Sequence, residues 1–279
     1  MSNYATENLR TLALVGHGSC GKTTLIEAML YRAGMIPEMG SIQRGTTMCD
    51  NDLLEKEVGH SIRLAVAHID TAMTDLTPVR IHILDTPGYP DYLGQDMSAL
   101  DAVKSVCAVI DPTKGPELLT RRLMAMAKER GLCRMIVINH MDDPEADLEK
   151  CLRELQETWG PGVLPINLPT RNRTHVIDCF DREDGDSDIM TVDDVHRAFI
   201  ERVVEEDDEM LERYLEEGSI DPRALHPLVT KALREGHVIP VCFCSAKKLI
   251  GIRDVMKVII RHLPSPAEAN DALFIKRDG

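Results

Sequence analysis

A glycine-rich segment near the N-terminus constrains the fold more than any other part of the sequence. The segment reads VGHGSCGKTT and contains two phosphate-binding patterns at once. Gly16, Gly18 and Gly21 match GxGxxG, which in a dinucleotide-binding fold lets the backbone approach a pyrophosphate. The second pattern, GxxxxGK(S/T), also begins at Gly16 and ends at Lys22 and Thr23. It is typical of mononucleotide P-loops, whose backbone N–H groups surround phosphates.

The residues beyond the loop decide between the two patterns. The apolar run LRTLALV ends at the loop, and apolar residues recur at helical spacing from Leu25 to Ala33, so the loop joins a strand to a helix. A dinucleotide site needs an acidic residue at the end of a second strand about 20 positions further on. That region reads PEMGSIQRGTT and contains no such strand end. A chance match to GxxxxGK(S/T) has odds of about one in a hundred, so we interpret the loop as a mononucleotide P-loop.

Predicted strands and helices alternate along most of the chain. Apolar runs predict strands at 9–15, 61–69, 79–85, 103–111, 133–140 and 238–247. Helical periodicity predicts helices at 25–33, 118–126, 144–160 and 249–263. Alternation of this kind predicts an α/β fold of the P-loop NTPase type, with a mostly parallel sheet covered by helices on both faces. Residues 40–59 show no clean period and are expected to form a mobile loop.

The interval between Asp142 and Ser245 is longer than this alternation requires. One helix, two loops and a strand need roughly 30 residues, and about 100 are present. The surplus contains a proline-rich stretch, an acidic patch at 181–188 and two predicted helices near 191–217 and 221–236. We interpret it as an inserted α+β subdomain.

These patterns divide the chain into three parts. Residues 1–160 and 238–263 are predicted to form the nucleotide-binding domain, with the inserted subdomain at 161–237. Residues 264–279 are expected to be a linker and the start of a following domain.

Composition argues against several classes of function. Acidic residues outnumber basic ones by 46 to 32, for a net charge of −14, which disfavours a broad basic surface for nucleic acid. There is no run of 18 apolar residues, so no membrane span is expected. The eight cysteines include no CxxC pair, and no secretory signal precedes them, which favours the cytoplasm. No histidine pairs with another His or Cys at zinc spacing, so no zinc site is expected.

Three further motifs follow the P-loop, each at the C-terminal end of a predicted strand. In Asp85-Thr86-Pro87-Gly88 the carboxylate suits a magnesium shell, and the glycine N–H suits a γ-phosphate. In Asn139-His140-Met141-Asp142 the final carboxylate can accept hydrogen bonds from N1 and N2 of guanine, which adenine lacks as donors. In Ser245-Ala246-Lys247 a backbone N–H can meet the guanine carbonyl oxygen. Ligands of α/β proteins bind at this strand edge, so together the motifs predict GTP or GDP with Mg²⁺.

With these motifs in this order, the whole chain resembles the GTP-binding domain of the translational GTPases, most closely elongation factor G and its elongation factor G-like paralogues. The segments LPINLP (164–169), VID (176–178) and HLPSP (262–266) also match the layout of that family. The resemblance implies a switch that hydrolyses GTP on the ribosome. It also implies that the chain is an N-terminal fragment, because the family continues into further domains beyond the point matched by Gly279.

The resemblance implies roles for individual residues as well. The phosphate contacts would come from Gly18, Ser19, Cys20, Gly21, Lys22, Thr23 and Thr24. The base contacts would come from Asn139, His140, Asp142, Ser245, Ala246 and Lys247. The family closes its first switch with a glycine-isoleucine-threonine stretch that aligns with Gly59-His60-Ser61, so Ser61 joins Thr23 and Asp85 as a candidate magnesium ligand. The catalytic candidates are Tyr89, Lys22 and Gly88.

The chain departs from the family pattern at three positions. Ser19 stands where the family P-loop has aspartate, and His140 stands where the base motif has lysine, which predicts weaker guanine binding. Tyr89 replaces the histidine of DTPGH, which approaches the attacking water. A tyrosine can orient a water but stays neutral, so slow hydrolysis in isolation is expected.

Two other functions remain open from the sequence. A guanine-nucleotide binding module with negligible turnover would act as a regulator, and Tyr89 is the feature that favours it. An ATP-dependent kinase or ATPase would need an adenine site, which Asp142 and Ser245-Ala246 disfavour. Whether the full-length protein translocates, recycles or protects ribosomes is also open.

Overall fold

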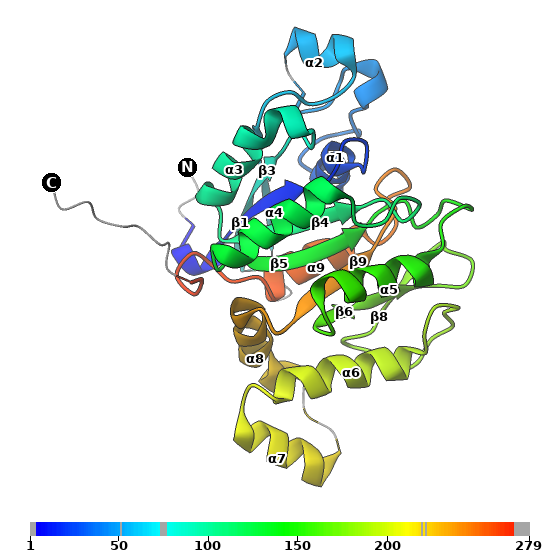
Figure 1. The fold of residues 1–279 in the computed structure, drawn as a ribbon. Helices are drawn as coiled ribbons and strands as arrows, with labels where there is room; N and C mark the ends of the chain where they lie inside the picture. Colours follow the sequence, from blue (N-terminus) through cyan, green and yellow to red (C-terminus); the bar gives the residue numbers. More distant parts are fainter. Residues whose placement is uncertain (1–3, 51, 73–76, 219, 221, 271–279) are drawn as a thin grey trace, which may run out of the picture.

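A computed structural model describes residues 4–50, 52–72, 77–218, 220 and 222–270 (Figure 1). A seven-stranded sheet lies at its centre, in the order β2-β3-β1-β4-β5-β9-β6. Its strands are β1 (Leu9–Val15), β2 (Ala65–Ala72), β3 (Pro78–Asp85), β4 (Ser105–Ile110), β5 (Cys133–Ile138), β6 (Val163–Pro165) and β9 (Ile239–Phe243). β2 runs antiparallel to β3, and the other pairs are parallel. The predicted mostly parallel α/β sheet is therefore confirmed.

Helices cover both faces of this sheet, because successive residues of a strand point to opposite faces. Along β1, Leu12 and Leu14 face one apolar core, and Ala13 and Val15 face the other. The first core receives α1 (Lys22–Arg32) and α9 (Ile252–Arg261). The second receives α3 (Leu93–Ala102), α4 (Leu118–Glu129) and α5 (Leu148–Trp159). The two 3₁₀ turns of this part are Thr6–Asn8 and Pro90–Tyr92.

β2 begins at Ala65, later than the start predicted at 61. The N–H groups of Ile62 and Arg63 donate to Oε1 of Glu55, at 2.9 and 3.0 Å. The N–H of Leu64 donates to the side chain of Gln95. Because these donors are already taken by side chains, the strand ladder starts only at the next residue.

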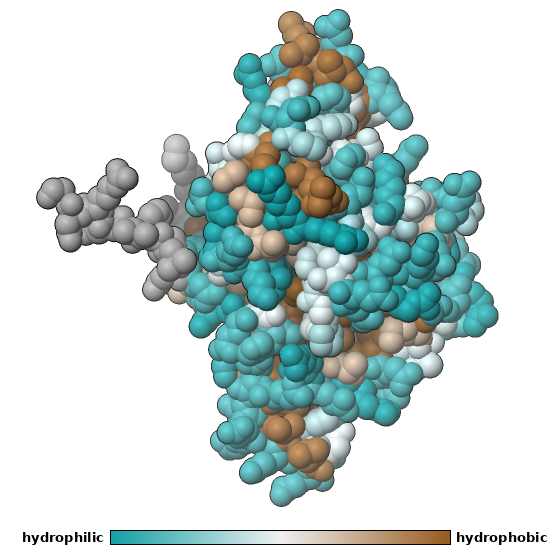
Figure 2. Space-filling view, viewed as in Figure 1, coloured by the Kyte–Doolittle hydropathy of each residue, from teal (hydrophilic) through white to brown (hydrophobic). Residues whose placement is uncertain are grey.

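The segment predicted as a loop at 40–59 contains two short helices. They are the 3₁₀ turn Ile42–Arg44 and α2 (Leu53–Val58). Asp52 caps α2, and its backbone N–H is bound in return by the carboxylate of Glu55. Leu53 is 82% exposed, and Figure 2 shows apolar side chains gathered on the surface at α2. Six residues with their apolar side chains outward give no helical periodicity, so the sequence pattern did not indicate α2.

The segment between α5 and β9 combines a small hairpin with three helices. β7 (Asn167–Pro169) pairs antiparallel with β8 (Val176–Asp178). The helices are α6 (Val192–Val204), α7 (Asp208–Glu217) and α8 (Pro222–Glu235). β6 lies within the predicted insertion but joins the main sheet beside β9. The exact division into domain and insertion stays a prediction.

The single helix predicted near 191–217 is wrong, because it divides into α6 and α7. The chain turns after Val204, and the side chain of Asp207 accepts a hydrogen bond from the N–H of Met210. Such an N-cap satisfies the first free N–H groups of a new helix and thereby favours a break at this point.

Within the described part of the chain, no helix has the length and apolar character needed to cross a membrane. All eight cysteines are buried as free thiols.

Candidate functional site

The P-loop folds back tightly between β1 and α1. Ser19 and Gly21 adopt left-handed backbone conformations, with φ of 68° and 94°. Nζ of Lys22 donates to the carbonyl oxygens of Gly16 at 2.9 Å and His17 at 3.1 Å. The amine therefore lies over the loop, at the start of a helix where backbone N–H groups and the helix dipole favour anions.

Gly88 lies directly against this lysine. A Cβ on Gly88 would collide with Nζ of Lys22 and with the carbonyl oxygen of Gly16, and its φ of +80° also favours glycine. The end of β3 and the P-loop therefore approach each other more closely than any side chain at this position permits.

Oxygen ligands gather where α1 begins. Oγ1 of Thr23 donates to Oδ2 of Asp85 at 2.6 Å and lies 3.3 Å from Oγ of Ser61. The Ser61 hydroxyl donates to Oδ1 of Asp50 at 2.7 Å. Thr23, Ser61, Asp85 and Asp50 are all buried. The three predicted magnesium ligands thus come together, with Asp50 as a fourth oxygen donor.

The chemistry of this cluster fits a magnesium ion. Mg²⁺ binds hard oxygen ligands such as carboxylates, hydroxyls and water. Among the described residues, Oδ1 of Asp85 has no hydrogen-bond partner although it is buried. Burial is the main cause that raises the pKa of Asp85 to about 6. The charges of Asp50 and Glu55 also raise this pKa, whereas the hydrogen bond from Thr23 and the charge of Lys22 lower it. A cation here would favour the ionised carboxylate.

Asn139 connects two of the predicted motifs to each other. Its Nδ2 donates to the carbonyl oxygen of Cys20 at 3.0 Å, and its Oδ1 accepts from the N–H of Ala246 at 2.9 Å. The residue is fully buried. A Cβ on Gly21 would collide with Nδ2 of Asn139, so the loop glycine also permits this contact.

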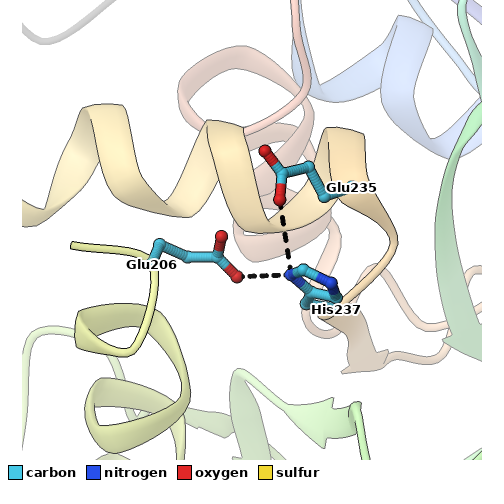
Figure 3. Close-up of side chains that lie close together, drawn as sticks. All are labelled: Glu206, Glu235 and His237. Carbon is cyan, nitrogen blue, oxygen red and sulfur yellow. Dashed lines mark hydrogen bonds and ion pairs between the residues drawn. The ribbon is translucent and has the colours of Figure 1, made fainter. Parts of the chain in front are cut away.

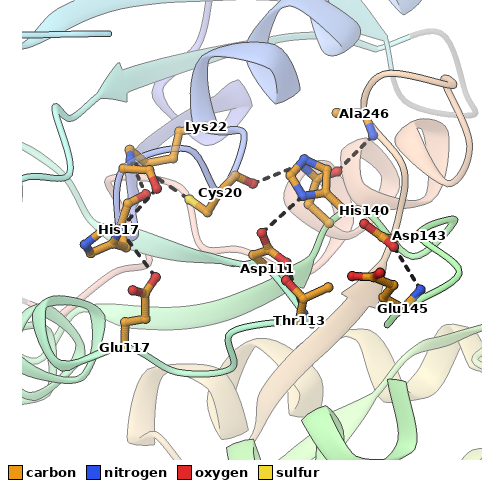
Figure 4. A network of polar contacts seen from close by, with 12 residues as sticks. His17, Cys20, Lys22, Asp111, Thr113, Glu117, His140, Asp143, Glu145 and Ala246 are labelled. Carbon is orange, nitrogen blue, oxygen red and sulfur yellow. Dashed lines mark hydrogen bonds and ion pairs between the residues drawn. The ribbon is translucent and has the colours of Figure 1, made fainter. Parts of the chain in front are cut away.

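The residues predicted to contact the base lie around Asn139. His140 has a φ of 55°, and its Nδ1 lies 3.7 Å from Oδ2 of Asp111 (Figure 4). Asp142 lies 2.9 Å from Nζ of Lys248. Burial opposes ionisation of Asp142, but hydrogen bonds from Ser245 and Lys248 outweigh it and hold the pKa of this carboxyl below its usual value.

The remaining predicted residues differ in burial. Ser245 and Ala246 are buried in a tight turn closed by hydrogen bonds between Ser245 and Ile250. The side chain of Lys247 is exposed, and Thr24 is half-buried. Apart from Ser61, which precedes β2, the predicted residues follow the C-terminal ends of β1, β3, β5 and β9, along one edge of the sheet.

Tyr89 extends over the P-loop from the residue after Gly88. Its ring tip lies so close to Gly18 that a Cβ there would collide with it. The ring also packs on that of His60, with centroids 4.6 Å apart and planes inclined by 44°. The ring of His17 lies 6.1 Å away, and Nδ1 of His17 is 3.4 Å from Oε2 of Glu117. Figure 4 shows His17 and Glu117 beside Lys22.

Sequence reasoning missed three buried carboxylates that hold residues 40–63. Glu27 accepts from the N–H groups of Gly40 and Met48. Glu55 accepts from the backbone at the end of the segment, and Asp50 binds Ser61. Asp50 and Glu55 stand in a polar segment and Glu27 stands in α1. Acidic residues are mostly exposed in proteins, so no local signal marks these three as buried.

A second cluster lies where α8 ends. Nδ1 of His237 is 2.7 Å from Oε1 of Glu206 and 3.6 Å from Oε2 of Glu235 (Figure 3). Nζ of Lys231 lies 4.0 Å from the other oxygen of Glu206. Because Nζ of Lys231 and Nδ1 of His237 both lie beside the carboxylate of Glu206, we interpret this cluster as a polar network.

Comparisons with known proteins agree on one family. Residues 7–265 match the family described as the elongation factor Tu GTP binding domain. An elongation factor G-like protein of Mycobacterium tuberculosis H37Rv is 31% identical over 273 residues, which cover 93% of this chain and 38% of that protein. The mitochondrial ribosome-releasing factor 2 of Drosophila melanogaster is 28% identical over 290 residues, which cover 95% of this chain and 38% of that protein.

A solved structure is similar over the same part of the chain. A crystal structure of a protein from Thermus thermophilus superimposes with a TM-score of 0.83 at 32% identity, covering 95% of this chain and 41% of that one. The chain thus spans about two fifths of the length of these relatives.

Proposed function

The chain belongs to the family of elongation factor Tu GTP-binding domains, and from this premise we propose that it is the GTP-hydrolysing switch of an elongation factor G-like translation factor. The observation that carries the proposal is the pair of hydrogen bonds made by Asn139. They tie the P-loop at Cys20 to the turn at Ala246. One nucleotide can therefore place its phosphates on the loop and its base beside Asp142.

Guanine is the base that these groups suit. The carboxylate of Asp142, held ionised by Ser245 and Lys248, would accept hydrogen bonds from N1 and N2 of guanine. The N–H donors of the turn at 245–247 would meet its carbonyl oxygen. His140 would cover one face of the base, with Asp111 orienting its ring. Hydrogen bonds to charged groups are worth about 1.5–3 kcal/mol, which is enough to separate guanine from adenine.

The phosphates would lie on residues 18–24. The amine of Lys22 would exchange its bonds to the Gly16 and His17 carbonyls for the β- and γ-phosphate oxygens. The N–H of Gly88 would meet the γ-phosphate, because Gly88 lies directly beside Lys22. The charge of Lys22 would then stabilise the transition state of phosphoryl transfer.

Thr23, Ser61 and Asp85 would hold Mg²⁺, with Asp50 supporting Ser61. When bound, this ion would neutralise charge on the β- and γ-phosphates. Ser61 reaches the site from the segment 40–61, so its hydroxyl would couple the conformation of that segment to the nucleotide. Thr23 would keep its hydroxyl oriented through Asp85.

For the whole protein, the proposal rests on the relatives, because this chain matches only part of their length. Because the names of the relatives refer to elongation and to release of ribosomes, we propose the ribosome as the partner of the full-length protein. Residues 1–160 and 238–263 would form the GTP-binding domain and 161–237 the inserted subdomain, and the segment predicted as a linker at 264–279 lies partly outside the described residues. The eight free thiols support a reducing compartment, and we propose the cytoplasm.

A nucleotide competition assay tests the base assignment. Fluorescent GDP bound to the chain is titrated with GDP, GTP and ATP in the presence of Mg²⁺, and Lys22→Ala serves as the variant with weakened phosphate binding. We expect GTP and GDP to displace the probe and ATP to fail at a hundredfold higher concentration. Equal displacement by ATP would reject a guanine site.

A second function is supported by Tyr89, whose phenol packs on Gly18 where the family has a histidine. A guanine-nucleotide binding module with negligible hydrolysis would need no charged side chain beside the attacking water. Phosphate release from GTP, measured with and without ribosomes, separates the two functions. Release that stays at the background level of Lys22→Ala in both conditions would favour the binding module.

A further inference from the structure

Arg173 lies in the turn of the β7–β8 hairpin, and its side chain reaches the loop that carries Asp142. Nη1 of Arg173 donates to the carbonyl oxygen of Asp143 at 2.8 Å and to that of Met141 at 3.4 Å. Its Nη2 donates to the carbonyl oxygen of Ala146 at 3.1 Å. Met141 and Asp143 are the two neighbours of Asp142 in the sequence. One guanidinium therefore holds the backbone on both sides of the carboxylate proposed to recognise guanine.

The loop held by Arg173 consists of residues 139–147, which join β5 to α5 through turns. Within it, the N–H of Asp143 donates to the carbonyl oxygen of His140 at 2.9 Å. The carboxylate of Asp142 is held by Ser245 and Lys248, which belong to the turn after β9. Arg173 holds the backbone of the same residue from the hairpin. The position of Asp142 thus depends on contacts from two separate segments.

The backbone at Arg173 favours a different type of residue. Its φ of 55° is left-handed, a conformation that costs a residue with a Cβ free energy that glycine avoids. Backbone hydrogen bonds close the turn around it, from the N–H of Arg173 to Thr170 at 2.7 Å and from the N–H of Thr170 to His175 at 3.0 Å. The turn alone would be satisfied by glycine, so what the arginine adds is the contact of its guanidinium with the loop 139–147.

The other end of the hairpin is fixed to β9. The buried side chain of Asn167, in β7, accepts from the N–H of Phe243 at 2.7 Å and donates to the carbonyl oxygen of the same residue at 3.2 Å. Phe243 is the last residue of β9, which leads into the turn at 245–247. The hairpin therefore contacts both segments proposed to bind the base.

We propose that Arg173 is a positioning residue for guanine recognition, whose guanidinium holds the loop 139–147 so that the carboxylate of Asp142 faces N1 and N2 of the base. This inference rests on the proposed function. It places one source of base selectivity in the predicted insertion, outside the four nucleotide-binding motifs. Hydrogen bonds weaken steeply when their angle is lost. A displaced loop would therefore weaken the contact to the base and leave the phosphate contacts of the P-loop in place.

Inosine diphosphate, IDP, is the probe that isolates this effect. Its base has the carbonyl oxygen and N1 of guanine but lacks the N2 amino group. A site built to bind such a group discriminates against the analogue without it, so the ratio of GDP affinity to IDP affinity reports the contact between N2 and Asp142. A general loss of stability or of phosphate binding would lower both affinities equally and leave this ratio unchanged.

The test is displacement of fluorescent GDP by GDP and by IDP in the presence of Mg²⁺. Arg173→Gly removes the guanidinium and suits the left-handed backbone of the turn. We expect this variant to lower the ratio about three- to tenfold. Arg173→Lys keeps the charge but not the fork of donors, so it should lower the ratio by a smaller factor. A ratio that stays unchanged in both variants, or an equal loss of GDP and IDP affinity, would overturn the proposal.

Arg171→Ala provides the matched control. It removes an arginine from the same hairpin, whose exposed side chain pairs with Asp186. Its ratio of GDP affinity to IDP affinity should equal that of the unaltered chain. A decrease as large as that of Arg173→Gly would mean that any change in the hairpin disturbs the site, and would reject the specific role of Arg173.

A double-mutant cycle with Asp142→Ala shows whether Arg173 acts through Asp142. If it does, adding Arg173→Gly to Asp142→Ala should cause no further fall in the ratio, because the carboxylate to be positioned is already absent. Fully additive losses would refute the proposal. Failure of the proposed function looks different, since the unaltered chain itself would then not prefer GDP to IDP.

Discussion

The backbone N–H of Ala246 donates to Oδ1 of Asn139 at 2.9 Å, at a point where neither residue reaches solvent. The amide nitrogen of the same side chain donates to Cys20 of the P-loop. Three segments that are far apart in the sequence are therefore fixed by one side chain. This side chain therefore helps to set the spacing between the proposed phosphate contacts and the proposed base contacts.

We predict that Asn139→Ala lowers both stability and GDP affinity. The substitution leaves the carbonyl of Cys20 and the N–H of Ala246 buried without their partner, and each such group costs about 1–3 kcal/mol. The free energy of unfolding should fall by about 2–4 kcal/mol, and GDP affinity should fall at least about tenfold. Urea unfolding and calorimetric titration measure the two effects.

The exposed Asn172 in the β7–β8 hairpin offers the control, since its side chain bonds only to neighbouring threonines among the described residues. Asn172→Ala should change the free energy of unfolding by less than about 1 kcal/mol and leave GDP affinity unaltered. An Asn139→Ala variant with native GDP affinity would contradict the bridging role.

Asp142→Asn is predicted to change the choice of base. The carboxylate would be exchanged for an amide that presents a donor towards N1 and N2 of guanine, so about 1.5–3 kcal/mol is lost. GDP affinity should fall about tenfold or more, and affinity for a xanthine nucleotide, which has a carbonyl at C2, should rise. Competition titrations with GDP and XDP measure both changes.

Asp143→Asn provides the comparison for that experiment. The carboxylate of Asp143 accepts a hydrogen bond from the N–H of Glu145 within its own turn, which an asparagine oxygen can also accept. Its GDP and XDP affinities should match those of the unaltered chain. If Asp142→Asn gave the same result as this control, the base would have to be bound elsewhere.

Without Mg²⁺, Asp85 should make the stability of the chain fall as pH rises. Burial raises its pKa to about 6 in the folded state, whereas an unfolded aspartate titrates near 3.9. Between about pH 4 and pH 6 the folded chain binds a proton at Asp85 that the unfolded chain has lost. The contribution of protonated Asp85 to the free energy of unfolding is therefore fully present below about pH 4 and is lost as the pH rises through about 6. The loss amounts to about 3 kcal/mol.

Urea unfolding in EDTA from pH 4 to pH 7.5 measures this effect. Relative to Asp85→Asn, the unaltered chain should lose stability across the window, and Mg²⁺ should restore it at pH 7.5 only when Asp85 is present. Asp184→Asn, in the exposed acidic patch, should follow the unaltered chain. Parallel pH curves for the unaltered chain and Asp85→Asn would show that Asp85 does not titrate in this range.

The parts of the fold that sequence reasoning predicted are those with strong local signals. The apolar runs at β1, β3, β4, β5 and β9 are buried throughout most of their length, so they read as strands without knowledge of their neighbours. The interpretation of residues 16–23 as the P-loop of a GTP-binding domain is confirmed by the family match. Its glycines and lysine are specified by local backbone and phosphate chemistry.

The parts that sequence reasoning missed depend on contacts between distant residues. Glu55 takes the N–H groups that would have started β2 earlier, and nothing near residue 61 indicates this. Asp50 belongs to the oxygen cluster only because Ser61 folds back onto it. α3 was not predicted, because only three of its ten residues are buried and its periodicity is weak. The predicted roles of the site residues await the experiments above.

Tyr89→His is the substitution that tests the hydrolysis step most directly. Histidine can donate a hydrogen bond and, with an ordinary pKa of roughly 6.5, can also carry positive charge near the γ-phosphate, whereas a tyrosine hydroxyl stays neutral until about pH 10. The imidazole is also shorter than the phenol that now reaches Gly18, so it fits the same space beside His60 without collision. We therefore expect Tyr89→His to bind GTP as tightly as the unaltered chain and to release phosphate about tenfold faster or more when ribosomes are present. Quenched-flow phosphate release measures the rate, and Tyr92→His, which changes the tyrosine of the 3₁₀ turn that follows Tyr89, serves as the control. An equal or slower rate for Tyr89→His would mean that another group orients the water and that Tyr89 does not limit hydrolysis.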